Sequence, residues 1–97
     1  MIVVRDIFQV KFGRMKEALE FWKEMAKTSP FTQENHPRVL TDLTGQYYTL
    51  VAEVSFKNLS DYESFCRKEM AGAGDLYHKK FVPLVDSGRR EILTVAQ

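Results

Sequence analysis

The chain has 97 residues, of which 44% are hydrophobic and 28% are charged, with 14 basic and 13 acidic side chains and one cysteine. A chain of this length buries enough surface for one layered core, so we expect residues 1–97 to form one domain and exclude a two-domain enzyme. The balanced charge argues against nucleic-acid binding, and the lone Cys66 cannot form an intrachain disulfide. Apolar runs such as Ile2-Val3-Val4 are far shorter than the ~20 residues that span a bilayer. We therefore expect a soluble cytoplasmic protein that contacts neither membrane nor nucleic acid.

The first element predicted is a strand at residues 2–12, because apolar and mixed positions alternate along it. The alternation places five apolar side chains on one face: Ile2, Val4, Phe8, Val10 and Phe12. Gly13 interrupts this pattern, and the apolar residues that follow recur at helical spacing: Met15, Ala18, Leu19, Trp22, Met25 and Ala26. We therefore expect an amphipathic helix over residues 14–28.

A β-hairpin is predicted next, with strands at residues 38–44 and 46–56 that are joined at Gly45. The even positions of the second strand are all apolar or aromatic: Tyr48, Leu50, Ala52, Val54 and Phe56. Its odd positions are mixed, so the even face is expected to meet the core. Because Tyr47 and Tyr48 are neighbours in this strand, we expect their side chains to point to opposite faces.

The second helix is predicted to begin at Ser60, because Ser60-Asp61-Tyr62-Glu63 has the sequence of a capping box. The segment Ala71-Gly72-Ala73-Gly74 weakens the helical pattern, and Pro83 should kink or shorten the segment that follows. Gly88 is expected to end this helical region, and residues 89–96 to form the last strand.

The order β-α-β-β-α-β is typical of the ferredoxin-like plait, an α+β fold in which two helices cover one face of a four-stranded antiparallel sheet. The other face would carry a set of partly apolar side chains: Val3, Ile7, Tyr47, Thr49 and Val51. Such a face is too apolar for water, and two of them could bury each other about 10 Å apart. We therefore expect a homodimer of sheets, and the alternative is a monomer with a modestly apolar exposed face.

Two segments resemble a known superfamily. The strand-to-helix junction Phe8-Gln9-Val10-Lys11-Phe12-Gly13-Arg14 resembles that of the dimeric α+β barrel proteins, which include the antibiotic-biosynthesis-type monooxygenases and the NIPSNAP proteins. The segment 81–93, in which Pro83-Leu84 leads into the last strand, resembles the NIPSNAP pattern. Phe12 stands where the family often has proline, and Asp6 stands where NIPSNAP relatives tend to carry a basic residue. The resemblance implies a plait paired into a dimeric α+β barrel, whereas the activities of the superfamily are too varied to transfer.

Asp6 and His78 are the candidates for catalysis. Asp6 interrupts the apolar face of the first strand, where a carboxylate needs a partner or a raised pKa and could act as a general base. The alternative is a β-bulge that turns Asp6 outward, or a pair with Arg5 or Arg38. His78 flanks the apolar stripe of the second helical region, where its near-neutral pKa would suit proton transfer. The alternative for His78 is an exposed or capping role.

Tyr48 and Trp22 are the candidates for substrate binding. Tyr48 could line a cleft between helix and sheet and orient a substrate, and Trp22 could form the wall of that cleft; the alternative is that both are packing residues. Some members of the superfamily oxidise electron-rich aromatic compounds with O₂ and no cofactor. The resemblance therefore implies a monooxygenase-like reaction on a small aromatic or apolar compound. The alternative is a non-catalytic module that binds a small ligand or a partner protein.

Haem binding is a further alternative. Haem-degrading members of the superfamily hold haem through a histidine of the second helix, which His78 would match. Their companion asparagine on the first strand and tryptophan on the third are missing here, where Asp6 and Tyr48 stand. The loop residue His36 lacks a second ligand, so no metal site and no cofactor are predicted.

Overall fold

The computed structural model describes residues 1–28 and 33–97, and the side chains of all of these except residues 28, 33 and 69–73. Its helices and strands follow the predicted order: β1 (Ile2–Val10), α1 (Met15–Thr28), β2 (Arg38–Thr41), β3 (Thr49–Phe56), α2 (Leu59–Leu76) and β4 (Val85–Thr94). A short 3₁₀ helix, η1 (Gln33–Asn35), precedes β2, and a π-helical turn, η2 (Tyr77–Phe81), and a 3₁₀ helix, η3 (Val82–Leu84), connect α2 to β4. No helix within the described ranges is long and apolar enough to cross a membrane.

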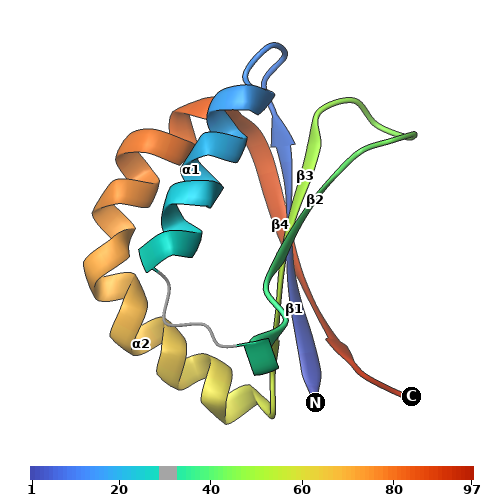
Figure 1. Ribbon diagram of the computed structural model, residues 1–97, viewed down its shortest axis with the longest axis vertical. Helices are drawn as coiled ribbons and strands as arrows, with labels where there is room; N and C mark the ends of the chain where they lie inside the picture. Colours follow the sequence, from blue (N-terminus) through green and yellow to red (C-terminus); the bar gives the residue numbers. More distant parts are fainter. Residues whose placement is uncertain (29–32) are drawn as a thin grey trace.

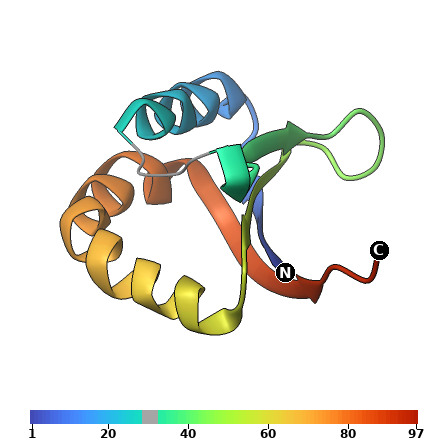
Figure 2. The ribbon, with the colours of Figure 1, turned by 60° about the horizontal axis from the view of Figure 1, so that its bottom comes forward.

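The four strands form one antiparallel sheet in the order β2-β3-β1-β4. Both helices lie against the same face of this sheet, and no described segment forms a layer over the other face (Figures 1 and 2). The α+β fold predicted from the sequence, with two helices over a four-stranded antiparallel sheet, is therefore confirmed.

The core lies between the helices and the upper half of the sheet in Figure 1 and combines aromatic with aliphatic side chains. It is formed by buried residues of every layer: Phe8, Val10, Ala18, Phe21, Leu50, Phe81 and Leu84. The helical spacing of Met15, Leu19 and Trp22 brings these side chains against this cluster, because residues three and four apart share a helix face. Because side chains alternate between the two faces of a strand, the even-numbered residues of β1 and β3 lie on the face that the helices cover.

The start of α2 differs from the prediction. The side-chain oxygen Oδ1 of Asn58 accepts a hydrogen bond from the backbone N–H of Asp61 at 2.9 Å, so Asn58 is the N-cap and Leu59 is the first helical residue. Ser60 therefore lies inside the first turn, and the predicted capping box is wrong. Asparagine and serine are both good N-caps, and the end of β3 at Phe56 sets which of them is used.

The end of the helical region and the role of Gly88 also differ from the prediction. One helix runs to Leu76, and the geometry changes at η2 rather than at the glycine-containing segment 71–74. Gly88 lies within β4 instead of ending a helix, since β4 begins at Val85. A β-carbon at position 88 would lie 3.0 Å from the Phe8 ring, so glycine leaves room for this ring where it crosses the strand.

The hairpin is shorter in its strands and longer in its loop than predicted, because residues 42–48 form the connection. Two hydrogen bonds close this loop: the Thr49 N–H donates to Oδ1 of Asp42 at 3.0 Å, and the Asp42 N–H donates to the Thr49 carbonyl at 3.2 Å. Within the loop, Gly45 and Tyr48 have left-handed backbones with φ of 103° and 58°. We call this segment the β2–β3 loop.

Candidate functional site

Asp6 lies at the centre of the sheet on the face that the helices cover. The register places it between Ala52 of β3 and Arg90 of β4. Nε of Arg90 donates a hydrogen bond to Oδ1 of Asp6 at 2.5 Å, and this bond raises the pKa of the Arg90 guanidinium. Asp6 thus has an arginine partner, but it is Arg90 rather than Arg5 or Arg38. The sequence did not single out Arg90, although pairing the first strand with the last would have brought the two residues together.

Tyr62 and Cys66 of α2 lie over the ion pair. The guanidinium carbon of Arg90 is 5.7 Å from the centroid of the Tyr62 ring, which is within range of a cation–π contact. Burial, together with the neighbouring Cys66 thiol, raises the pKa of Tyr62 to about 12. Tyr62 is therefore a neutral phenol at pH 7, and its hydroxyl can donate a hydrogen bond. We call Asp6, Arg90, Tyr62 and Cys66 the interior polar cluster.

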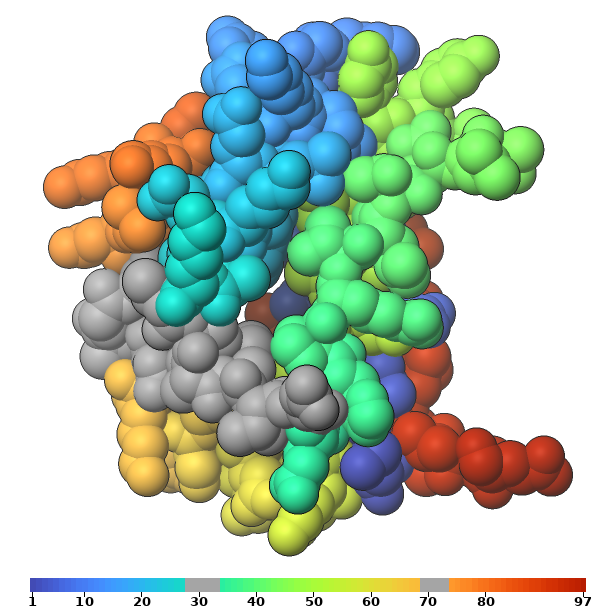
Figure 3. Space-filling model, in the orientation of Figure 1, coloured from blue at the N-terminus to red at the C-terminus, as the bar shows by residue number. Residues whose placement is uncertain are grey.

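Two buried polar atoms on the helix side have no hydrogen-bond partner among the described residues: the Tyr62 hydroxyl oxygen and Nε1 of Trp22. Such an atom costs free energy unless a water or a ligand satisfies it. Figure 3 shows the molecule hollowed between the end of α1 and β2, with atoms of β1 and β4 at the floor of the hollow. These are the strands that carry Asp6 and Arg90.

Trp22 packs among aromatic rings of the core. Its ring centroid lies 5.4 Å from those of Phe21 and Phe81 and 6.2 Å from that of Phe8. Tyr77 of η2 continues the aromatic wall, with its ring centroid 5.4 Å from that of Phe81. Burial and the negative charge of Asp6 raise the pKa of Tyr77.

His78 lies outside this interior. It is exposed on η2, and its ring lies edge-on to Tyr77 with 5.6 Å between centroids. The structure therefore does not bring His78 together with Asp6 in an enclosed site. Within the described ranges no group of three or more His, Cys, Asp or Glu residues could hold a metal ion.

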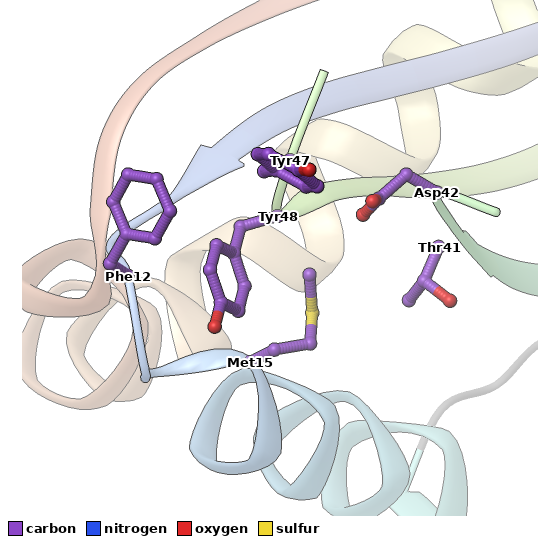
Figure 4. Close-up of a pocket in the computed structure, with 6 residues that line it drawn as sticks. All are labelled: Phe12, Met15, Thr41, Asp42, Tyr47 and Tyr48. Atoms are coloured by element: carbon purple, nitrogen blue, oxygen red, sulfur yellow. The ribbon is translucent and has the colours of Figure 1, made fainter. Parts of the chain in front are cut away.

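Tyr48 lies in a different pocket, at the end of the sheet. This pocket has a volume of about 340 Å³ and is lined by residues of α1, of the end of β2 and of the loops before α1 and β3: Phe12, Met15, Thr41, Asp42, Tyr47 and Tyr48 (Figure 4). Both tyrosines line it, and neither lies in a strand as predicted, because β3 begins at Thr49. The left-handed backbone of Tyr48 breaks the alternation that a regular strand would impose. We call this site the aromatic pocket.

The helix-free face carries a row of alternating charges across all four strands. Glu53 is bound by two arginines, with 2.9 Å to Nε of Arg5 and 2.7 Å to Nη2 of Arg38, and Glu91 lies 3.9 Å from Arg5 and 4.0 Å from Arg89. The row is flanked by apolar side chains: Val3, Ile7, Leu40, Val51 and Leu93. The sequence pattern places Glu53 on the mixed face of its strand. The row could not be predicted, because it depends on which residues of neighbouring strands lie side by side.

No family model matches the chain, and none of the curated proteins matches it. Solved structures do match. A NIPSNAP family protein from Agrobacterium tumefaciens is 19% identical over 98% of this chain and 86% of its own, with a TM-score of 0.81. A second NIPSNAP family protein from the same organism, described as having unknown function, is 17% identical over 100% and 89%, with a TM-score of 0.82.

A candidate antibiotic biosynthesis monooxygenase from Nitrosomonas europaea is 12% identical over the whole of both chains, with a TM-score of 0.72. These likenesses show the fold. The two groups named by the sequence resemblance, the NIPSNAP proteins and the antibiotic-biosynthesis-type monooxygenases, are thus both among the structural neighbours.

Proposed function

We propose that this protein binds a small aromatic or apolar compound between its helices and its sheet, where Tyr62 and Arg90 hold an oxygen atom of the ligand. The observation that carries this proposal is the buried Tyr62 hydroxyl, which has no partner among the described residues and lies beside the Asp6–Arg90 pair. A ligand oxygen would satisfy this hydroxyl, and the aromatic wall around Trp22 would cover the ring of the ligand.

The electrostatics of the interior polar cluster favour a ligand whose oxygen can ionise. The raised pKa of Tyr62 keeps its proton in place, so this side chain acts as a donor and not as a base. The Arg90 guanidinium supplies positive charge to a phenolate or enolate oxygen. When Arg90 turns toward such an oxygen, the Asp6 carboxylate is released to accept the proton.

This arrangement supports the proposal of a cofactor-independent monooxygenase-like reaction. The anion of an electron-rich aromatic compound can react with O₂ at a ring methylene, which becomes a carbonyl while the second oxygen atom leaves as water. The methylene carbon gives up all four electrons that O₂ takes, so no other reductant is needed. The solved structure described as a candidate antibiotic biosynthesis monooxygenase supports this reaction class through its fold alone.

The alternative is a non-catalytic module that binds the same kind of compound. It is supported by the closed ion pair, in which Oδ1 of Asp6 is already occupied by Arg90, and by the exposure of His78. In this case Arg90 and Tyr62 would hold the ligand without proton transfer.

The proposed assembly is a cytoplasmic homodimer in which two helix-free faces pack together. The apolar side chains that flank the charge row support it, since Leu40 and Leu93 are 39% and 44% exposed in one copy. Each glutamate of the row has arginine neighbours within its own sheet, so burial would leave none of these carboxylates without a counter-charge.

Two probes test the proposed function. 1-Naphthol has an ionisable hydroxyl, whereas 1-methoxynaphthalene is its ether and has none; the binding of both is measured by quenching of Trp22, the single tryptophan. We expect 1-naphthol to bind more tightly, and Tyr62→Phe to weaken it about fivefold to tenfold through loss of one hydrogen bond. Because the variant also removes an unpartnered hydroxyl, its free energy of unfolding should rise by about 1 kcal/mol.

Tyr47→Phe removes a hydroxyl from an exposed tyrosine and is the matched control. It should change neither the binding of 1-naphthol nor the free energy of unfolding. Oxygen uptake with anthrone, whose ring methylene forms an anion, then separates the two functions. Binding with oxygen uptake supports the monooxygenase-like reaction, and binding without it supports the module. If neither naphthalene quenches Trp22, or if Tyr62→Phe binds as the parent does, both functions are refuted.

A further inference from the structure

We propose that the aromatic pocket is a second site, which binds a small quaternary or methylated ammonium ion. The pocket has a volume of about 340 Å³, at the lower end of the ~300–1,000 Å³ typical of small-molecule sites. It shares no residue with the interior polar cluster, so this inference does not depend on the proposed function.

Three aromatic rings and a thioether form the walls of the pocket. The rings of Phe12 and Tyr48 meet edge to face with 5.0 Å between centroids, and Figure 4 shows Tyr48 between Phe12 and Met15. Phe12 and Tyr47 are 79% and 71% exposed, which is unusual for residues whose rings normally stabilise a core. Aromatic faces attract cations through their quadrupole, and this attraction is strongest for cations that are weakly hydrated.

A single carboxylate gives the pocket its charge. Asp42 is the charged residue among those that line it, and no described residue forms an ion pair with it. Its Oδ1 is fixed by the Thr49 N–H at 3.0 Å, which leaves Oδ2 free of this bond. Figure 4 shows the carboxylate turned toward the space beside Tyr47 and Tyr48. An anion would therefore be repelled, whereas a cation would find both a counter-charge and aromatic faces.

The backbone of Tyr48 supports a binding role for this site. A φ of 58° places this bulky residue in the left-handed region, which costs of order 1–3 kcal/mol. The two Asp42–Thr49 hydrogen bonds and the bond from the Thr49 hydroxyl to the Gln46 carbonyl, at 2.9 Å, hold the loop in this conformation. The same loop therefore places the Tyr48 ring against Phe12 and the Asp42 carboxylate at the pocket.

Carbon substituents on the ammonium group distinguish the expected ligand from a simple amine. A primary ammonium ion keeps strong hydrogen bonds to water that the apolar walls cannot replace, whereas methyl groups contact these walls favourably. The chemistry of the pocket thus matches a small methylated ammonium compound.

Choline and its neutral isostere 3,3-dimethyl-1-butanol are the probes that test this inference. Each is titrated into the ¹⁵N-labelled protein, and the amide signal of Thr49 reports on the carboxylate that it contacts. We expect saturable shifts at Thr49, Tyr47 and Tyr48 with choline, and binding of the neutral alcohol that is roughly tenfold weaker. Equal binding of the two, or choline shifts that avoid these residues, would overturn the proposal without affecting the proposed function.

Variants separate the contributions of charge and rings. Asp42→Asn keeps an oxygen for the Thr49 N–H but removes the charge, and should weaken choline binding about fivefold to tenfold. Phe12→Leu removes an exposed ring and should weaken choline binding severalfold. The matched control Asp61→Asn removes a carboxylate from the first turn of α2, at the opposite end of the molecule (Figure 1). This variant should leave choline binding unchanged. Undiminished binding in Asp42→Asn would contradict the assigned ligand class.

Discussion

The Glu53 carboxylate lies on the helix-free face of the sheet, yet its side chain is only 8% exposed because Arg5 and Arg38 close over it. Burial alone would raise the pKa of this carboxyl, but the hydrogen bonds and charges of the two arginines outweigh burial, and the pKa falls below its ordinary value of 4.5. Protonation of Glu53 is therefore easier in the unfolded chain than in the folded one.

This difference predicts an acid-sensitive contribution to stability. Because the folded pKa is lowered, the stabilisation is fully present above pH 4.5 and is lost as the pH falls through the folded pKa. Glu53→Gln should lower the free energy of unfolding at pH 7 by about 1–2 kcal/mol and should flatten its decline between about pH 5 and pH 3. Urea unfolding at several pH values measures both effects.

Glu63→Gln is the matched control, since it makes the same chemical change at an exposed glutamate of α2. It should leave the unfolding free energy at pH 7 and its pH dependence close to those of the parent. An equal loss of pH dependence in both variants would show that Glu53 is not the responsible group.

The interior site was only half predictable at the residue scale. Asp6 could be found because a carboxylate breaks an otherwise apolar alternation, and this break is visible in the sequence. Arg90 could not be found in this way, because it belongs to the basic pair Arg89-Arg90 and such pairs are usually solvated. Only the β1–β4 register brings it to Asp6. The buried hydroxyl of Tyr62, which has no partner among the described residues, becomes visible only once the helix is placed on the sheet.

Periodicity predicted the elements better than it predicted their ends. Alternation located β1 and β3, and helical spacing located α1, because these patterns extend over many residues. Single residues placed the boundaries and were less reliable: Gly88 resembles a helix stop but lies under the Phe8 ring in β4. Its local sequence does not reveal this contact, which joins residues eighty positions apart.

The N-terminus of α2 gives a test at the scale of one element. Asn58→Ala removes the side chain that accepts the Asp61 N–H, so the free energy of unfolding should fall by about 1 kcal/mol. Ser60→Ala is the matched control, and it should cost little because Ser60 lies within the first turn rather than at the cap. The two variants are compared by urea unfolding. A larger loss for Ser60→Ala would reinstate the capping box.

At the scale of the whole molecule, the two faces of the sheet differ in what covers them. The helices of this chain cover one face (Figure 2), and the charge row with its apolar flanks lies on the other. Leu93 and Ile92 are neighbours in β4 with similar exposed fractions, 44% and 43%, but they point to opposite faces. This pair therefore allows the proposed dimer to be tested one face at a time.

We expect the parent protein to elute at twice its chain mass of 11.3 kDa in size-exclusion chromatography with light scattering. Leu93→Lys places a charge in the proposed sheet–sheet interface and should shift the protein to the monomer mass at micromolar concentration. Ile92→Lys, on the helix side, should leave the dimer intact because its long side chain can extend to water. A monomeric parent, or identical masses for the two variants, would refute the sheet-to-sheet dimer.

The strand order has a consequence for how the chain acquires its structure during synthesis. The first strand to leave the ribosome, β1, occupies the middle of the sheet, and both of its neighbours, β3 and β4, come from the second half of the chain. Neither edge of β1 can be paired until these later strands emerge. The centre of the sheet therefore forms late, through contacts between distant parts of the chain.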